Sequence, residues 1–212
     1  MLPERVNYES LKCDYSNPSS LNYKKLRLVD QHVPKGHSLL DIGAGTGEFI
    51  TLEIPKFDEI YGVDTDKESL KILMERFKTK KNVHIIESDL KNLSMIFSNN
   101  KFDCISCLDV LEHIELQECK IVLQYIYEIT KNFGFLVCTF PGIFEKIRIS
   151  IGISPTHLHS HSSYGWMKLI KEVGFDILNV ETIEFPLVDN DFLRRNIHIF
   201  GKCCMIIAQK IL

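Results

Sequence analysis

The fold is set by the stretch Leu39-Leu40-Asp41-Ile42-Gly43-Ala44-Gly45-Thr46-Gly47-Glu48-Phe49-Ile50. An apolar run ends there in an acidic residue, three glycines follow at every second position, and an amphipathic pattern begins after them. This order predicts a strand, a tight turn and a helix whose N-terminus Thr46 would cap. Glycine adopts positive φ without steric cost and, lacking Cβ, lets a ligand approach the backbone. Open α/β sheets bind nucleotides at such turns, so we expect a nucleotide site here.

The spacing of the glycines distinguishes between nucleotides. The dinucleotide fingerprint G-x-G-x-x-G has its third glycine where this chain has Glu48. A carboxylate at that point would repel a pyrophosphate, which disfavours a nicotinamide-dependent oxidoreductase. The remaining pattern, D-x-G-x-G-x-G, closely resembles motif I of the class I S-adenosylmethionine-dependent methyltransferases. The resemblance implies that the cofactor is S-adenosylmethionine, that Asp41 lies near its ammonium group, and that the turn passes under its methionine part through Gly43, Ala44, Gly45 and Gly47.

A second strand, predicted over residues 59–64, also ends in an acid. It ends about twenty residues after the glycine turn, where α/β nucleotide sites place a carboxylate that accepts hydrogen bonds from the ribose. We therefore predict that Asp64, with Thr65 beside it, binds the ribose. A helix over Lys67–Phe77 should follow, with Asp66 as its cap. The alternative for Asp64 is that it only caps this helix.

The third strand, predicted over residues 82–90, repeats the arrangement of strand and acid. A strand-end aspartate taken alone is more often a turn or cap residue. The methyltransferase resemblance implies instead that Asp89 faces the exocyclic amine of adenine and that Leu90 packs on the ring.

The fourth strand, predicted over residues 101–108, runs into Asp109-Val110-Leu111-Glu112-His113-Ile114. This segment resembles motif IV of small-molecule methyltransferases of the ubiquinone and menaquinone biosynthesis type, and we expect Leu108, at the strand's end, to contact the cofactor. DNA and many RNA N-methyltransferases carry a D/N-P-P-aromatic motif at this point, and this chain has none. Cys104 and Cys107 should point to opposite faces of the strand, so we do not expect them to form a redox or metal pair.

Methyl transfer to an oxygen with a high pKa requires removal of a proton, and histidine is the usual base near neutral pH. His113 and three histidines of the later segment, His157, His159 and His161, are the candidates, of which we select His113 and His159 as catalytic. No metal ligand is assigned. The alternative left open is a divalent ion held by Asp109, Glu112 and His113, which would share a face if a helix began directly after the fourth strand.

The rest of the chain completes one methyltransferase domain over residues 1–212. We expect an N-terminal arm or cap over about 1–34, a substrate lid inserted over about 141–161, and a helix over residues 162–173 closed by Gly174. Strands over 175–183 and 197–208 should follow. The predicted fold class is α/β, a Rossmann-like, mostly parallel sheet of seven strands with helices on both faces and the last strand antiparallel.

Composition limits the partners that we expect. The formal net charge is −3, from 25 basic and 28 acidic residues, and no dense basic block stands out, so nucleic acid is disfavoured. There is no long apolar run and residues 1–5 do not begin a signal peptide, so we expect a cytoplasmic protein, monomeric or homodimeric, with reduced cysteines. The predicted function is transfer of a methyl group to a small-molecule acceptor, at oxygen or else at nitrogen or carbon. The alternatives are a non-catalytic protein that binds S-adenosylmethionine and an RNA or protein methyltransferase.

Overall fold

The computed structural model describes residues 18–99, 101–142, 149–150, 152, 157–159, 161–183 and 203–211. Within them, seven strands form one sheet in the order β3-β2-β1-β4-β5-β7-β6. The strands are β1 (Gly36–Ile42), β2 (Phe57–Asp64), β3 (Val83–Glu87), β4 (Phe102–Leu108), β5 (Thr130–Pro141), β6 (Phe175–Ile183) and β7 (Cys203–Lys210). Strands β1 to β5 pair with one another in parallel, and β7 is antiparallel to both β5 and β6. The predicted fold class is confirmed. Residues 1–17 of the predicted arm or cap, most of the predicted lid, and residues 197–202 of the last predicted strand lie outside the described residues.

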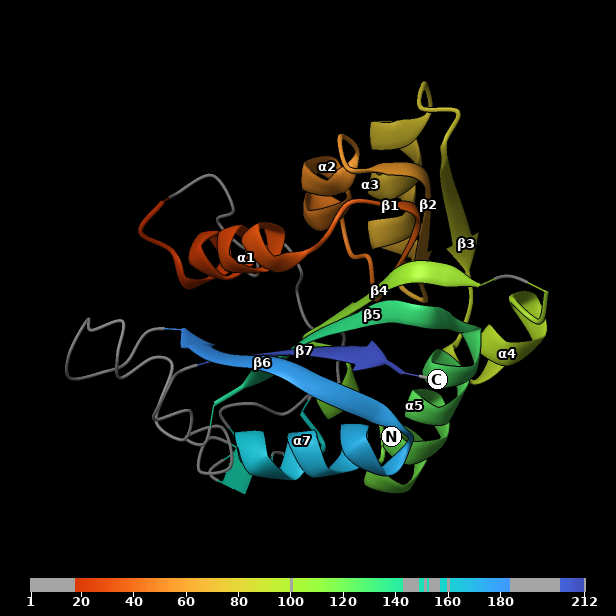
Figure 1. Cartoon of the computed structure of the whole chain (residues 1–212). Helices are drawn as coiled ribbons and strands as arrows, with labels where there is room; N and C mark the ends of the chain where they lie inside the picture. Colours follow the sequence, from red (N-terminus) through yellow and green to blue (C-terminus); the bar gives the residue numbers. More distant parts are fainter. Residues whose placement is uncertain are drawn as a thin grey trace, which may run out of the picture.

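Helices cover both faces of the sheet (Figure 1). The helices α1 (Leu21–His32), α2 (Glu48–Glu53) and α3 (Lys67–Phe77) share one hydrophobic cluster with β1, to which they contribute residues such as Val29, Ile50 and Leu73. The helices α4 (Leu93–Ile96), α5 (Leu116–Ile129) and α7 (Ser163–Glu172) share the cluster on the other face. Two short 3-10 turns, η1 (Leu90–Asn92) and η2 (Leu111–His113), follow the ends of β3 and β4. Both turns therefore lie at the carboxyl edge of the parallel strands.

In strand β4, side chains that point to opposite faces of the sheet belong to different hydrophobic clusters. Cys104 belongs to the cluster with α1, α2 and α3, whereas Cys107 belongs to the cluster with α5 and α7. The two thiols are therefore on opposite faces, as predicted. The six cysteines of the described residues are free and buried.

The order of the strands places a topological switch point at the carboxyl ends of β1 and β4. From β1 the chain adds β2 and β3 on one side of the sheet, whereas β4 and β5 lie on the other side. Loops that leave β1 and β4 therefore diverge, and such switch points are where open α/β sheets bind ligands. The glycine turn follows β1, and the segment that contains Asp109, Glu112 and His113 follows β4.

Candidate functional site

The glycine turn has its three glycines in the left-handed region, with φ of 71° at Gly43, 54° at Gly45 and 85° at Gly47. A Cβ on Gly43 would lie 2.4 Å from a methyl carbon of Val110, and one on Gly47 would lie 2.5 Å from Leu73. A Cβ on Gly45 would meet no atom within 4 Å. Packing therefore requires the two outer glycines, whereas Gly45 faces open space into which a ligand can approach the backbone.

The predicted cap of α2 is wrong in its detail. Gly47 is the N-cap residue and makes no side-chain capping bond, because its left-handed conformation turns the chain into the helix one residue after Thr46. The Thr46 hydroxyl instead donates to Oε2 of Glu48 at 2.6 Å, and Oε1 of Glu48 pairs with Arg76 of α3 at 3.0 Å. Glu48 therefore connects the start of α2 to α3.

Asp64 connects the end of β2 to the glycine turn. Its Oδ2 accepts a hydrogen bond from the backbone amide of Gly45 at 2.7 Å, and its Oδ1 accepts from the amides of Thr65 and Asp66 at 2.7 and 2.9 Å. An ionised carboxylate has about four acceptor sites, so these three bonds leave capacity for a further donor. The capping of α3 is done by Asp66, which accepts from the amide of Ser69 at 2.7 Å, as predicted.

Asp89 and Leu90 follow β3 at the same edge of the sheet. The Asp89 side chain is exposed and caps η1 by accepting from the amide of Lys91 at 2.9 Å, and Leu90 is half-buried. The amide of Ser88 donates to the backbone oxygen of Asp64 at 3.0 Å, which ties the ends of β2 and β3 together. Leu108, at the end of β4, is also half-buried. The structure thus places these predicted residues along one edge of the sheet.

Asp41 lies under the turn, inside the sheet. It is 2% exposed, and the hydroxyl of Ser106 on β4 donates to its Oδ1 at 2.7 Å. Burial raises the pKa of Asp41 to about 7, against the Ser106 hydrogen bond, and the carboxylates of Asp64 and Glu48 raise it further. A cation brought close to Asp41 would favour its ionised form.

Asp109 does not join Glu112 and His113, because no helix begins directly after β4. Its φ is 54°, and its amide donates to the backbone oxygen of Thr139 at 3.1 Å, which extends the contact between β4 and β5 by one residue. Its carboxylate accepts from the Thr139 hydroxyl at 2.8 Å and forms an ion pair with Lys25 of α1. The structure does not bring Asp109 together with Glu112 and His113, as the alternative metal site required, and Asp109 instead connects α1 to the sheet.

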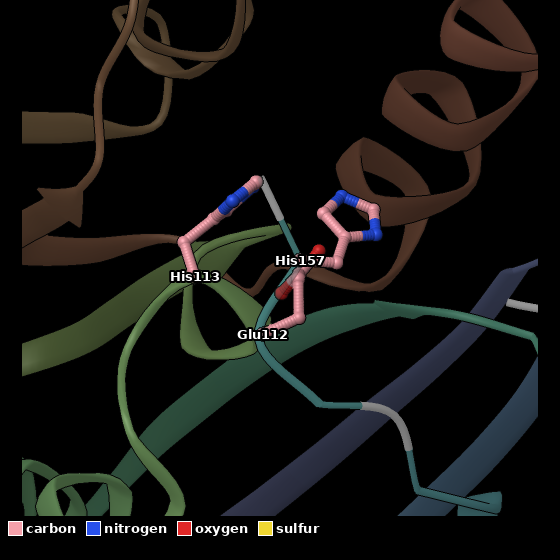
Figure 2. A group of neighbouring side chains, drawn as sticks. All are labelled: Glu112, His113 and His157. Atoms are coloured by element: carbon pink, nitrogen blue, oxygen red, sulfur yellow. The ribbon is translucent and has the colours of Figure 1, made fainter. Parts of the chain in front are cut away.

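A different cluster forms at this edge, made of Glu112, His113 and His157 (Figure 2). One donor atom from each residue lies within 4.8 Å of the others, and the two imidazole rings are 4.7 Å apart with their planes at 74°. The Glu112 side chain is buried, His113 is exposed and His157 is half-buried. The amide of Leu158 donates to the backbone oxygen of Glu112 at 2.8 Å, which holds the segment 157–159 against η2.

His159 lies in a separate cluster beside α5 and α7. Its Nε2 is 3.3 Å from Sγ of Cys119, and its ring centroid is 5.1 Å from that of His161 and 5.4 Å from that of Trp166. Burial lowers the pKa of His159. The two histidines predicted to be catalytic therefore occupy different environments, and only His113 belongs to the cluster of Glu112 and His157.

Comparison with known proteins agrees with this architecture. A family model described as a methyltransferase domain matches residues 39–134. The chain is similar to demethylmenaquinone methyltransferases from Staphylococcus carnosus, with 25% identity over 136 residues, and from Anoxybacillus flavithermus, with 24% identity over 135 residues. These alignments cover 63% and 62% of this chain but 55% and 56% of the relatives, so the chain spans about half the length of the curated relatives it matches.

Solved structures of methyltransferases share the fold. An S-adenosylmethionine-dependent methyltransferase from Archaeoglobus fulgidus matches 97% of this chain and 100% of its own, with a TM-score of 0.72 and 20% identity. The N-methyltransferase NodS from Bradyrhizobium japonicum, solved with S-adenosyl-L-homocysteine, matches 96% of this chain and 97% of its own, with a TM-score of 0.69 and 13% identity.

The described residues contain no helix that is both long enough and apolar enough to cross a membrane. The residues matched by the family model run from β1 to the start of β5 and so include the glycine turn together with the ends of β2, β3 and β4. The matched segments build the carboxyl edge of β1, β2, β3 and β4; over these residues the chain is a methyltransferase domain, and as a whole it has the fold of the S-adenosylmethionine-dependent methyltransferases.

Proposed function

We propose that the chain transfers the methyl group of S-adenosylmethionine to an oxygen atom of a small-molecule acceptor. One observation carries the proposal: the Asp64 carboxylate lies against the amide of Gly45, whose Cα faces open space at the switch point of the sheet. This arrangement supplies an acceptor for ribose hydroxyls next to a backbone that a ligand can approach. The family match supports the choice of cofactor.

The cofactor would lie along the carboxyl edge of β1, β2 and β3. In the proposed arrangement its ammonium group approaches Asp41, its ribose lies at Asp64 and Thr65, and its adenine lies between Asp89 and Leu90. Leu108 and the turn residues Gly43, Ala44 and Gly47 complete the site. The methyl group then faces the loop that follows β4, where an acceptor can bind.

The protein's main task would be alignment. The sulfonium activates its own methyl group, and the acceptor displaces the sulfur in line, so proximity and orientation supply most of the rate. An acceptor hydroxyl must also lose its proton, and we propose His113 as the base, with His159 as the second candidate. His159 favours its neutral form because burial lowers its pKa, which keeps it able to accept a proton at neutral pH.

The helix α1 is the part of the proposed cap over residues 1–34 that bears on the site. Lys25 is 8% exposed in its side chain and pairs with Asp109 in the loop after β4. His32, at the other end of α1, lies 3.1 Å from Glu181 of β6. These contacts support a role for α1 as a wall beside the acceptor, within a single domain that also includes the lid over 141–161.

The choice of a small molecule rests on charge and motif. The net charge of −3 and the lack of a dense block of Lys and Arg in the sequence disfavour a nucleic-acid acceptor, and the segment after β4 lacks the D/N-P-P-aromatic sequence. The similarity to demethylmenaquinone methyltransferases is compatible with an acceptor that contains an aromatic ring.

The test is methyl transfer from radiolabelled S-adenosylmethionine to phenols, quinols and a fractionated metabolite extract. We expect label in a small organic product with the parent protein and its loss in Asp64→Asn. The matched control is Asp58→Asn, an exposed acid near the other end of β2 that pairs with His37 at 2.9 Å. Label found only in added RNA or protein, or cofactor binding without transfer to any acceptor, would contradict the proposed function.

A further inference from the structure

We propose that Glu112, His113 and His157 bind a divalent transition-metal ion of the zinc type at the carboxyl edge of β4. The binding site stands on the geometry of the cluster alone. A catalytic role for the ion rests in addition on the proposed function, because it requires an acceptor hydroxyl next to the cofactor.

The three side chains already converge. Their donor atoms lie within 4.8 Å of one another, and Figure 2 shows the Glu112 carboxylate between the two imidazole rings. Ligands of a tetrahedral zinc ion at about 2.0–2.2 Å lie about 3.4 Å apart, so binding needs donors that are at most 4.8 Å apart to approach by no more than about 1.4 Å. His113 is exposed and His157 is half-buried, so rotation of the two rings is not opposed by core packing.

The backbone holds the three residues together independently of any ion. Glu112 and His113 are neighbours in η2, where the amide of His113 donates to the backbone oxygen of Val110 at 3.0 Å. The third residue comes from 44 positions further along the chain, and the bond from the amide of Leu158 to the backbone oxygen of Glu112 sets its position. The cluster is therefore a product of the tertiary fold and not of sequence proximity.

The donor set indicates the class of ion. Two imidazoles and one carboxylate form the ligand set of many zinc sites that keep an open coordination position, and imidazole favours zinc, cobalt, nickel, copper and iron over magnesium and calcium. Glu112 is 1% exposed. A buried carboxylate is costly to ionise, and a bound dication would offset that cost. Asp109 is not a ligand of the proposed ion, because its carboxylate is bound by Lys25 and Thr139.

The position of the cluster indicates what the ion would do. Val110, two residues before Glu112, packs against Gly43, where an added Cβ would lie 2.4 Å from a Val110 methyl carbon. The cluster therefore adjoins the glycine turn. An acceptor hydroxyl at the open position would release its proton to solvent more readily, and His113 would then serve as a ligand and not as the base. The oxygen then forms a bond to the methyl carbon as the carbon–sulfur bond breaks. The electron pair of that bond stays on sulfur, which gives the methyl ether and neutral S-adenosylhomocysteine, with no change in the oxidation state of the ion.

Metal binding is measured on the cofactor-free protein after chelation and removal of the chelator. Calorimetric titration with zinc(II) and visible spectra with cobalt(II) should show one ion per chain. The cobalt spectrum should lack the charge-transfer bands of thiolate ligands, although Cys119 is nearby.

The variants His113→Ala and His157→Ala should each weaken binding by more than about tenfold, because loss even of groups that only support a metal ligand costs about 10–100-fold. Glu112→Gln tests the carboxylate, and the two histidine variants keep the test valid if the buried change prevents folding. The matched control is His84→Ala, a histidine of β3 that contacts Glu59 at 2.6 Å and belongs to no part of the cluster.

Failure to bind zinc(II) or cobalt(II), thiolate bands, or equal affinity in the His157→Ala and His84→Ala variants would overturn the metal site. If the site binds an ion but methyl transfer, once an acceptor is found, is the same after chelation, the catalytic role is overturned and the site stands. Because the titrations need no acceptor, failure of the proposed function leaves their result unaffected.

Discussion

Replacement of Asp41 by asparagine should stabilise the cofactor-free protein at alkaline pH and weaken binding of the cofactor. Asp41 is buried beneath the glycine turn, where desolvation raises its pKa from 3.8 to about 7. Below pH 3.8 the carboxyl is protonated in both the folded and the unfolded chain and contributes nothing. Between pH 3.8 and 7 the folded chain binds more protons than the unfolded chain, so stability falls as the pH rises. Above pH 7 the loss is complete.

The magnitude follows from the same values. Each pKa unit corresponds to 1.36 kcal/mol, so the parent protein should lose about 2–3 kcal/mol of unfolding free energy between pH 5 and pH 8 through Asp41 alone. The Asp41→Asn variant lacks this loss. Its amide oxygen can still accept the Ser106 hydrogen bond, whereas its NH2 group brings a desolvation cost of about 1–3 kcal/mol that does not depend on pH. The difference in stability between variant and parent should therefore rise by about 2–3 kcal/mol from pH 5 to pH 8.

Urea unfolding at several pH values measures this difference, and Trp166, the single tryptophan of the chain and 1% exposed, reports unfolding by its fluorescence. A second variant, Ser106→Ala, keeps the carboxyl but removes the hydrogen bond that lowers its pKa, so its loss of stability should extend to higher pH. A difference between Asp41→Asn and the parent that stays constant from pH 5 to pH 8 would refute the reasoning.

Three further changes test other parts of the structure. Gly45→Ala should lower the unfolding free energy by about 1–2 kcal/mol, because the residue has a positive φ, and chemical unfolding measures this loss. It should also weaken cofactor binding, measured by calorimetry, because the added methyl group enters the open space beside the turn. Asp64→Asn should weaken binding of S-adenosylhomocysteine by about 1–3 kcal/mol, measured by calorimetry against Asp58→Asn, and equal affinity in both variants would place the ribose elsewhere. Lys25→Met should lower the unfolding free energy by about 1–3 kcal/mol by leaving Asp109 without its cation, and an unchanged urea midpoint would show that this pair does not hold α1.

Features set by local sequence could be predicted closely. The bounds of α3 and β6 are those expected, because apolar spacing, the Asp66 cap and Gly174 with its φ of 110° act within a few residues. The start of α1 is likewise fixed by Ser20, which accepts from the amide of Tyr23 at 3.1 Å. In each case the decisive interaction spans no more than one turn of chain.

Features that depend on distant segments could not be predicted. The alternative metal site required a helix directly after β4. That helix does not form, because Asp109 bonds to Thr139 of β5 and to Lys25 of α1, and neither contact is visible in the local pattern. The start of β5 at Thr130 likewise depends on a distant segment, because Thr130 pairs with Phe102 of β4 and the chain bends at Phe133, whose φ is 63°.

The site shows the same division between local and distant information. Asp64 and Asp89 lie at the edge of the sheet because each follows the end of a strand, and the sequence indicates where these strands end. The joining of His157 to Glu112 depends on a backbone bond between segments more than forty residues apart. Histidine spacing alone gave four candidate bases without showing that two of them, His113 and His157, share a carboxylate.

The central claim is that S-adenosylmethionine binds at the glycine turn against Asp64. Calorimetric titration of the parent protein and of Asp64→Asn with S-adenosylhomocysteine, with NAD as the competing nucleotide, tests it most directly. We predict one site per chain with affinity in the micromolar range for the parent, weaker binding in Asp64→Asn, and no competition by NAD. Tight binding of NAD with no response to S-adenosylhomocysteine would contradict the account.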